Sequence, residues 1–421
     1  MQDQVHLSVG GKAETRSFAS GLAKWCIYLL LAFPIVDYTL RTFVHPIGSI
    51  WDKLMLLLLS LIALTRYIRG QREIPFGWAK FAGWFILYCF GLLMVGLGHP
   101  SVAFDGFRFD VYYILFGLLM PFIMNREDVP KFFHLAASVA ILVAVDGIFQ
   151  YIMKAPIPGS WVDVTESVRT RVFSVFLSPN ELGAYMELMT PIIFGLFMVE
   201  KVRIRRWIYG IGSLCCFLTL LFTFTRGAWM GFFVGVVFVA VLYQRRLLIL
   251  IAVVAVIGFF LPPIHHRIMD VFSPVYMLKA AQGGRLLRWM DAFDQMSTNP
   301  LFGAGLGRYG GSVASLHGYS IYSDNYYAKM LGETGLLGLV LFLMLHISII
   351  RELMKKVVRH AQGKEKFLAL GGLAGLTAFL VDNCVENVFE YAPNIIAYFL
   401  MVSLFLIWGR SLQSREGQLD E

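Results

Sequence analysis

Charged residues are scarce in this chain of 421 residues, of which they make up only 15%. A typical soluble domain has about 25% charged residues and about 45–50% apolar ones. Here 57% of the residues are hydrophobic. This balance excludes a soluble enzyme and a disordered chain, and it indicates a polytopic membrane protein. The net charge of +8 does not predict nucleic-acid binding, because the basic residues form no patch with interleaved aromatic residues.

Cysteines are also few, and their positions exclude the usual cysteine chemistry. All five lie in apolar stretches without metal-ligand spacing or a pairing pattern: Cys26, Cys89, Cys215, Cys216 and Cys384. We expect them to behave as small hydrophobic residues. Internal repeats and low-complexity tracts are not found. We expect no cleaved signal peptide, since the first apolar stretch follows a basic start and continues as an anchor.

Long hydrophobic runs are abundant. A bilayer crossing takes about 20 mostly apolar residues. Twelve segments qualify, and they lie near residues 23–42, 53–68, 78–98, 107–125, 132–153, 180–199, 206–224, 227–243, 247–262, 329–350, 366–386 and 393–409. As one helix, the run 206–262 would reach about 85 Å against a hydrocarbon core of about 30 Å. We therefore divide that run into three crossings, at its interruptions near 226 and 244–246.

The basic residues predict the orientation of these spans. With a cytoplasmic N-terminus, the inner segments hold 23 of the 36 Lys and Arg and 11 of the 28 Asp and Glu, a net charge of +12. The outer segments and spans then carry a net charge of −4. The positive-inside rule favours this orientation, with both termini cytoplasmic. We expect one transmembrane domain, 23–409, between an N-terminal tail, 1–22, and a C-terminal tail, 410–421.

Two outer loops, about 154–179 and 263–328, are too long to be simple connectors. The second has helical spacing from residue 284 to residue 296, with apolar residues on one side. We therefore expect one or more helices that lie on the outer membrane face.

Arg226 lies in a tight outer turn between two apolar helices. An arginine near the membrane centre costs about 2.5–3.5 kcal/mol on insertion scales, so it tends to be paired or functional. One interpretation is an interfacial anchor that reaches water. The flanking residues Thr225 and Gly227 favour the other, a packed polar pocket.

Arg171 lies shortly before a pattern that predicts the start of a helix. Ser178 and Glu181 have capping-box spacing, and Pro179 is at the first helical position. A helix cap explains these three residues fully. It explains neither Arg171 nor the neighbouring Arg169.

The second outer loop contains two further patterns. Gly303, Gly305 and Gly307 have the spacing of a phosphate-cradling loop, although this pattern alone is more often a turn. Asp324 precedes the tenth span and is either a base or an acceptor-binding group, or else the N-cap of a helix. His317, seven residues earlier, is a second candidate base.

Asp382, Glu386 and Glu390 have i, i+4, i+8 spacing at the outer end of the eleventh span. On one helix they share a face, which predicts either a water-filled cavity or an interfacial surface that pairs with outer arginines. His265 and His266 have no acidic or cysteine partner at ligand spacing, so we expect a structural role and no metal site.

Taken in order, these patterns resemble the O-antigen ligase and polymerase superfamily of membrane glycosyltransferases. The resemblance covers roughly residues 165–410. It rests on the following residues: Arg171 with Ser178, Pro179 and Asn180; Thr225, Arg226 and Gly227; Gly284 and Arg285 with Trp289; the segment 299–305; and Asp324 and Asn325 with Gly335 and Gly338. The resemblance implies an all-α, GT-C-like fold with about twelve spans and a large outer loop, in agreement with the topology above.

The resemblance also implies an activity. Family members transfer glycan from an undecaprenyl-pyrophosphate carrier to a glycan or glycolipid acceptor, outside the bacterial cytoplasmic membrane and without a metal or other cofactor. By resemblance, Arg171, Arg226 and Arg285 bind the pyrophosphate. Guanidinium groups suit this role because they bind phosphate oxygens in pairs and stabilise the charge of a leaving diphosphate.

The catalytic candidates are Asp324, Arg226 and Arg285. The candidates for substrate binding are Arg171, Arg288, Asn180, Asn325, His317 and Glu386. Ligases of the family carry a histidine at the position of Asp324, and an aspartate is a weaker base unless its pKa is raised. The base is therefore Asp324, His317 or an acid such as Glu386.

The departure from histidine favours a polymerase that joins repeat units, or a ligase with another acceptor. The alternative from a different class is a transporter or flippase for a glycolipid or a small anion, which twelve spans and a buried acidic stripe also suit. A transporter should show internal repeats with broken helices, and the sequence shows no such symmetry.

Overall fold

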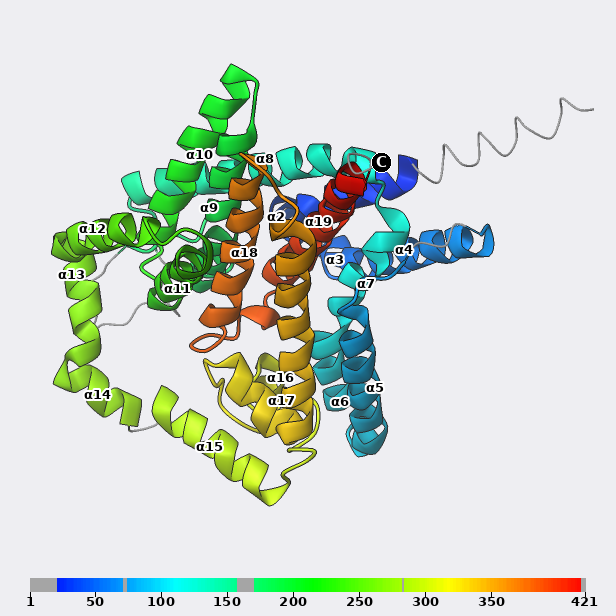
Figure 1. Cartoon of the computed structure of the whole chain (residues 1–421). Helices are drawn as coiled ribbons and strands as arrows, with labels where there is room; N and C mark the ends of the chain where they lie inside the picture. Colours follow the sequence, from blue (N-terminus) through cyan, green and yellow to red (C-terminus); the bar gives the residue numbers. More distant parts are fainter. Residues whose placement is uncertain (1–20, 71–73, 157–169, 282–283, 418–421) are drawn as a thin grey trace, which may run out of the picture.

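The computed structural model describes residues 21–70, 74–156, 170–281 and 284–417. Its regular elements in these ranges are all helices, as Figure 1 shows, so the predicted all-α class is confirmed. Three parts of the predicted organisation lie outside the described residues: the tail residues 1–20, the tail residues 418–421, and residues 157–169 of the first long loop, which include Arg169.

Each of the twelve predicted spans contains a helix. In chain order the helices are Gly21–Leu31 with α2 (Phe33–Phe43), α4 (Trp51–Ile68), α5 (Ala79–Val95), α6 (Pro100–Phe107) with α7 (Ile114–Ile123), α8 (Val129–Ile152), α9 (Pro179–Val199), α10 (Arg203–Phe222), α11 (Arg226–Tyr243), α12 (Leu247–Phe260), α17 (Tyr326–Leu353), α18 (Glu365–Asp382) and α19 (Ala392–Gly417). The run 206–262 forms three helices, as predicted.

Shorter helices connect the long ones. They are α3 (His45–Gly48), α13 (Pro262–Met269), α14 (Pro274–Ala281), α15 (Arg285–Thr298) and α16 (Ser312–Leu316). The helix predicted from 284 to 296 is therefore confirmed as α15. That these outer helices lie on the membrane face stays a prediction.

Among the described residues, seven helices are long and apolar enough to cross a membrane. Three further pairs of helices, which meet at bends of 80°, 44° and 91°, bring the number to at most ten. The two remaining predicted spans, α4 and α18, have 18 residues each and contain three charged residues each. The chain is thus a multi-pass membrane protein, and the count of twelve spans stays a prediction.

The centre of the molecule is formed by α9 and α19. In the most apolar stretch of each, 78% of the residues are buried, compared with 28% in α5 and in α11. α9 packs mainly against α10 and α18, and α18 packs also against α11. The outer helices expose large apolar side chains, as expected for a surface in contact with lipid.

Glycines on α11 allow its close approach to α18. Gly227, Gly231 and Gly235 recur at intervals of four residues and so share one face. A methyl group at Gly231 would lie 2.8 Å from the carbonyl oxygen of Ala378, and one at Gly235 would collide with that of Ala374. Small residues at this spacing let two backbones pack directly in a membrane.

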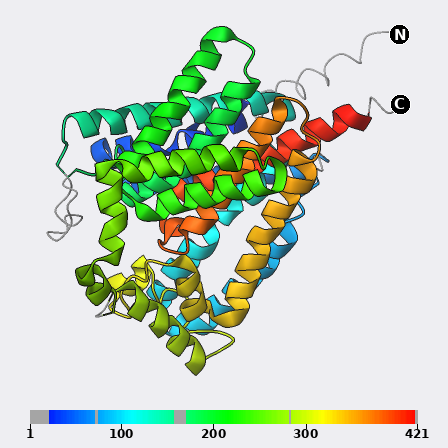
Figure 2. The ribbon, with the colours of Figure 1, turned by 60° about the vertical axis from the view of Figure 1, so that its left-hand side comes forward.

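α13, α14 and α15 form an arm that leads away from α12 and returns to α17 (Figure 1). Figure 2 shows the same arm from another side, descending from the layer of long helices toward α16 and the start of α17. The bend between α12 and the α13 segment is 91°, and α15 packs against α17. The arm thereby carries its arginines back to the helix bundle.

The glycine pattern at 303–307 forms no phosphate cradle, so that interpretation is wrong. Gly303, Gly305 and Gly307 have positive φ angles of 63°, 95° and 73°, which only glycine adopts readily. The N–H of Gly305 donates to the carbonyl oxygen of Glu333, and the N–H of Gly307 donates to its carboxylate. These amides therefore hold the loop against α17.

Candidate active site

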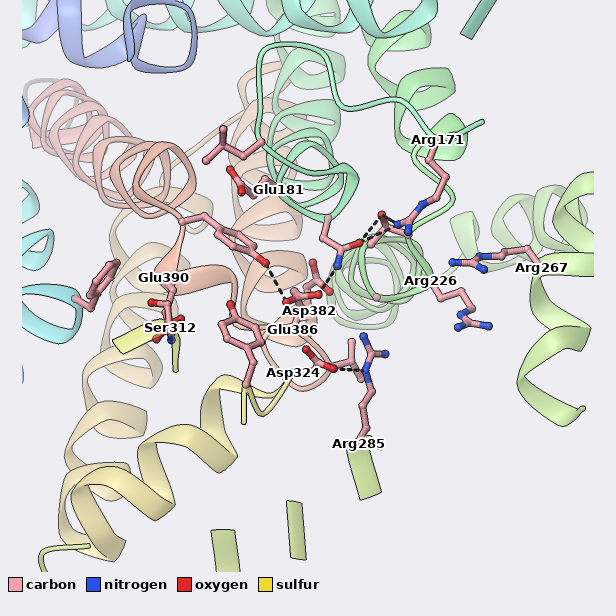
Figure 3. Close-up of a pocket in the computed structure, with 18 residues that line it drawn as sticks. Arg171, Glu181, Arg226, Arg267, Arg285, Ser312, Asp324, Asp382, Glu386 and Glu390 are labelled. Atoms are coloured by element: carbon pink, nitrogen blue, oxygen red, sulfur yellow. Dashed lines mark hydrogen bonds and ion pairs between the residues drawn. The ribbon is translucent and has the colours of Figure 1, made fainter. Parts of the chain in front are cut away.

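A cavity of about 650 Å³ lies where the first residues of α9 and α11 meet the end of α18 and the arm. It gathers six of the nine predicted site residues. The lining consists of Phe109, Arg171, Leu177, Asn180, Glu181, Thr225, Arg226, Gly227, Arg267, Arg285, Ser312, Tyr322, Asp324, Asp382, Val385, Glu386, Glu390 and Tyr391. Figure 3 shows the basic and acidic groups on different sides of the cavity.

Four helices begin at the cavity, namely α9, α11, α15 and α17. Asn180, Arg226 and Arg285 lie in the first turns of α9, α11 and α15, and Asp324 lies two residues before α17. Helix N-termini present N–H groups without helical partners and a partial positive charge. Together with the arginines, they make one side of the cavity suitable for an anion.

Arg171 fixes the turn between α10 and α11. Its Nε donates to the carbonyl oxygen of Thr223 at 2.9 Å, and its Nη2 donates to Asn180 Oδ1 at 2.9 Å and to Thr225 Oγ1 at 3.1 Å. The side chain is buried. Arg171 therefore lines the cavity and also positions the residues around Arg226.

Arg226 is the first residue of α11, and its guanidinium group lies 4.8 Å from the ring centre of Tyr276 on α14. The neighbouring Thr223 and Thr225 are buried. The structure thus places Arg226 in the packed polar pocket that its flanking residues predicted.

A fourth arginine, Arg267 of α13, was not among the predicted site residues. It is only 4% exposed, and its Nε donates to the carbonyl oxygen of Phe224 in the α10–α11 turn at 3.0 Å. The signal for Arg267 was present in the sequence, because it is a further arginine of the predicted outer loop 263–328.

The start of α9 follows the predicted capping pattern. Ser178 is the N-cap, its Oγ accepts a hydrogen bond from the N–H of Glu181 at 3.2 Å, and Pro179 is the first helical residue. This cap presents Asn180 to the cavity, where its Nδ2 donates to Glu386 Oε2 at 2.5 Å.

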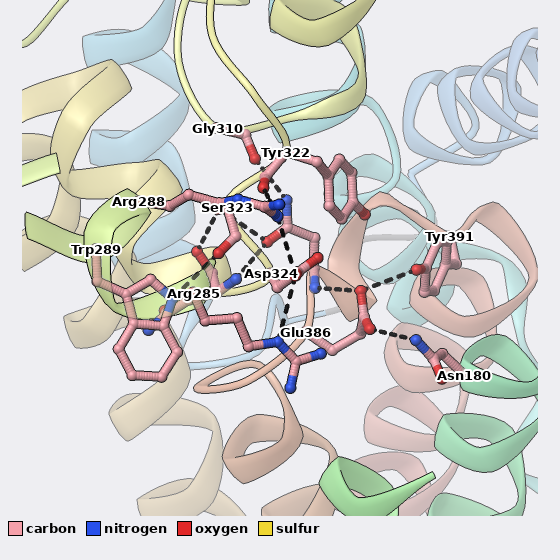
Figure 4. Close-up of polar contacts among 12 residues, drawn as sticks. Asn180, Arg285, Arg288, Trp289, Gly310, Tyr322, Ser323, Asp324, Glu386 and Tyr391 are labelled. Carbon is pink, nitrogen blue, oxygen red and sulfur yellow. Dashed lines mark hydrogen bonds and ion pairs between the residues drawn. The ribbon is translucent and has the colours of Figure 1, made fainter. Parts of the chain in front are cut away.

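Asp324 does not cap α17, so that interpretation is wrong. Asn325 is the cap, because its Oδ1 accepts from the N–H of Ala328 at 3.0 Å. Asp324 has a φ of 50°, a conformation that aspartate tolerates better than most residues. Its Oδ2 accepts from Arg285 Nε at 3.3 Å and from Arg288 Nη1 at 3.2 Å, as Figure 4 shows for Arg285.

The three acids predicted to share one helical face do not belong to one helix. α18 ends at Asp382, Glu386 lies in the following loop, and Glu390 closes a short 3-10 turn. All three nevertheless line the cavity. Both carboxylate oxygens of Asp382 are buried and have no hydrogen-bond partner among the described residues.

Glu386 is the acid most closely connected to Asp324. Burial raises the pKa of its carboxyl group, and the nearby charge of Asp324 raises it further, against the opposing effect of Arg285. Its Oε1 accepts from the hydroxyl of Tyr391 at 3.0 Å (Figure 4). Glu386 thus binds Asn180 of α9 and Tyr391, and its charge interacts with that of Asp324.

Residues 211–343 match the model of a protein family described as O-antigen ligase. Over these residues the chain is similar to that family. The resemblance to the O-antigen ligase and polymerase superfamily is thereby confirmed. No curated protein matches the chain. The matched range contains Arg226, Arg267, Arg285 and Asp324, while Arg171 and the acids after α18 complete the cavity from outside that range.

Three predicted site residues do not line the cavity. Arg288, which lies outside the cavity lining, donates to Asp324 and also to the carbonyl oxygen of Tyr322 at 2.7 Å. Asn325 is occupied as the cap of α17. His317 is exposed at the end of α16 and is absent from the lining. The geometry therefore favours Asp324 or Glu386 over His317 as the group that acts on a substrate in this cavity.

Proposed function

We propose that the protein is a glycosyltransferase that moves an oligosaccharide or polysaccharide from an undecaprenyl-pyrophosphate carrier to a hydroxyl group of an acceptor glycan. The reaction takes place on the extracytoplasmic face of the bacterial inner membrane. The observation that carries the proposal is a single cavity in which four arginines and four helix N-termini lie beside five acidic residues. The match of residues 211–343 to the O-antigen ligase family supports a function in glycan transfer.

The basic side of the cavity receives the diphosphate of the donor. Arg226, Arg267 and Arg285 approach it from α11, α13 and α15, so the two phosphates are contacted from several directions. Guanidinium groups stay charged and can each bind two phosphate oxygens. These groups stabilise the negative charge that develops as the diphosphate leaves.

The acidic side of the cavity receives the acceptor. The acceptor hydroxyl oxygen attacks the anomeric carbon, the bond from that carbon to the phosphate oxygen breaks, and the configuration inverts. Asp324 takes the hydroxyl proton. Both of its ion pairs use Oδ2, which leaves Oδ1 for the acceptor. Arg285 pairs with Asp324 and lines the cavity, so it connects the base to the leaving group.

The test of this function is transfer by purified protein in proteoliposomes without an ion gradient, with lipid-linked glycan as donor. Removing one preorganised group of this kind typically costs about 100-fold to 1,000-fold in rate. We expect such a loss for Arg226→Ala, with an unchanged unfolding temperature. Arg245→Ala is the matched control, since Arg245 is exposed in the turn between α11 and α12, away from the cavity lining.

Normal product from Arg226→Ala would contradict the arginine assignment. Movement of the glycolipid across the membrane without formation of longer glycan would instead support the transporter alternative. The lipid-linked glycans that accumulate in a deletion strain distinguish two forms of the proposal. Single repeat units on the carrier indicate a polymerase, and finished polymer on the carrier indicates a ligase.

A further inference from the structure

A second cavity, of about 500 Å³, lies between α15 and the segment 308–321. It shares no lining residue with the first cavity. Arg288 connects the two, because it lines the second cavity while its Nη1 donates to Asp324 in the first. Figure 4 shows Arg288 and Asn180 on opposite sides of Asp324. The second cavity thus adjoins the candidate base on the side away from Asn180.

The lining of this cavity combines hydrogen-bonding groups with an aromatic surface. Asp291, Asp294 and Gln295 extend from one side of α15, and neither carboxylate forms an ion pair with a described residue. Carboxylate and amide groups are strong partners for hydroxyl groups. Two carboxylates and an amide in a row therefore suit a ligand that offers many hydroxyls and no strong charge.

The aromatic surface comes from Tyr319, which is 44% exposed. The guanidinium group of Arg308 lies 5.8 Å from the centre of its ring, and the ring of His99 packs against its edge at 6.5 Å. These contacts hold the ring in place while leaving surface open. An amphipathic ring of this kind packs against the apolar C–H face of a sugar. Tyr309 is buried in the wall, and its hydroxyl donates to the carbonyl oxygen of Arg288.

We propose that this cavity binds the saccharide units of the acceptor chain that follow the reacting sugar. The inference rests on the proposed function and adds a binding site for the acceptor. The arginines and helix N-termini on the other side of Asp324 form the proposed site of the diphosphate donor. A glycan chain that extends from Asp324 past Arg288 therefore belongs to the acceptor. The volume lies within the range of about 300–1,000 Å³ that is typical of ligand pockets.

The test measures binding of free oligosaccharides to the purified protein by calorimetry. The probes are oligosaccharides of one and of three repeat units, released by mild acid from the surface polysaccharide of the cells that produce this protein. We expect the longer probe to bind more tightly. Asp291→Asn, Asp294→Asn and Tyr319→Ala should each weaken binding of the longer probe by about fivefold to tenfold, as for a lost hydrogen bond or packing contact.

The matched control is Asp105→Asn. Asp105 is a half-buried acid on α6 whose ion pair is with Arg108, and it is not in the lining of the second cavity. We expect it to keep the affinity of the unaltered protein for both probes. Equal affinity of the unaltered protein for the two probes would overturn the inference, as would equal effects of the three variants on both probes.

A second experiment measures binding of the same glycan attached to its lipid carrier. If the variants weaken binding of this donor and spare the free oligosaccharide, the cavity holds donor glycan and the inference is wrong. In the transfer assay, we expect the variants to raise KM for long acceptors and to preserve kcat. Length-dependent binding in a protein that transfers nothing would refute the proposed function while leaving the saccharide site standing.

Discussion

The side chain of Asp324 is held by two arginines while its backbone occupies the left-handed region. Asparagine tolerates this conformation almost as well as aspartate does, so Asp324→Asn removes the carboxylate with little backbone strain. We expect turnover to fall by about 100-fold to 10,000-fold, the usual contribution of a general base. Affinity for the donor should be retained, since the cavity arginines remain. Steady-state transfer and donor binding, measured on the same preparation, check this, and turnover equal to that of the unaltered protein would exclude Asp324 as the base.

Glu386 should give the reaction a pH dependence. Burial and Asp324 raise the pKa of its carboxyl group above the ordinary glutamate value of about 4.3. As the pH falls through this raised pKa, Glu386 gains a proton and becomes a weaker acceptor for Asn180. We expect the transfer rate to fall there, at a higher pH than for an exposed glutamate, and we expect Glu386→Gln to remove that acidic decline.

The unfolding temperature over the same pH range serves as the control for Glu386. A carboxyl whose folded-state pKa is raised contributes stability that is present at low pH and lost as the pH rises through that pKa. This group therefore loses activity and gains stability on acidification. If the transfer rate of Glu386→Gln still falls at low pH, another group is responsible for the pH dependence.

At the same scale, six of the nine site residues predicted from the sequence line the cavity. Arg226 and Arg285 could be predicted because they are arginines in the part of the chain, outer segments and spans together, that carries a net charge of −4. The choice between Asp324 and Asn325 as helix cap could not be predicted, because both are good caps and the backbone turn decides between them. His317 has suitable chemistry for a base, yet its exposure at the end of α16 follows from tertiary structure.

At the scale of elements, the end of α18 explains why the predicted acidic stripe failed. The spacing of Asp382, Glu386 and Glu390 fits a helix, but Asn383 ends it. Its Nδ2 donates to the carbonyl oxygen of Phe379 at 2.7 Å, and its Oδ1 accepts from the N–H of Phe389 at 3.2 Å. Periodicity alone does not reveal such side-chain competition for the backbone.

The packing of α11 predicts a large effect for a small substitution. A methyl group at Gly231 would collide with Glu187 and lie close to the carbonyl oxygen of Ala378. Gly231→Ala should therefore push α11 away from α9 and α18 and lower the free energy of unfolding by about 1–3 kcal/mol, as overpacking does. Thermal unfolding in detergent measures this loss.

The control for this prediction is Gly258→Ala on α12, where an added methyl group meets no atom within 4 Å. It should leave stability unchanged or slightly improved, because alanine favours helix more than glycine does. Equal loss of stability in both variants would show that the close contact of α11 is not responsible for the loss.

At the scale of the whole molecule, hydropathy located the helices better than it counted the spans. Each predicted segment contains a helix, yet three of them are bent pairs, and bends depend on tertiary packing. Asp52 of α4 and Asp382 of α18 are buried inside the protein. Burial among other helices allows charges that lipid would exclude. The three charged residues in each of α4 and α18 are therefore compatible with a membrane crossing.

The orientation of the molecule can be tested with one of its own cysteines. Cys384 is exposed two residues beyond the end of α18, whereas Cys26, Cys89 and Cys216 are buried. We expect a membrane-impermeant maleimide to label intact spheroplasts at Cys384, since the net charge of +12 on the other side predicts that this end of α18 is outside. Labelling should disappear in Cys384→Ser.

The variant Arg245→Cys, made in the Cys384→Ser background, tests the opposite side of the membrane. Arg245 is exposed in the turn between α11 and α12. The charge distribution predicts that this turn is cytoplasmic, so the introduced cysteine should react only after permeabilisation. If Cys384 required permeabilisation and the cysteine at 245 did not, the orientation would be reversed. The cavity would then face the cytoplasm, and transfer on the outer face would be excluded by topology before any assay of the arginines.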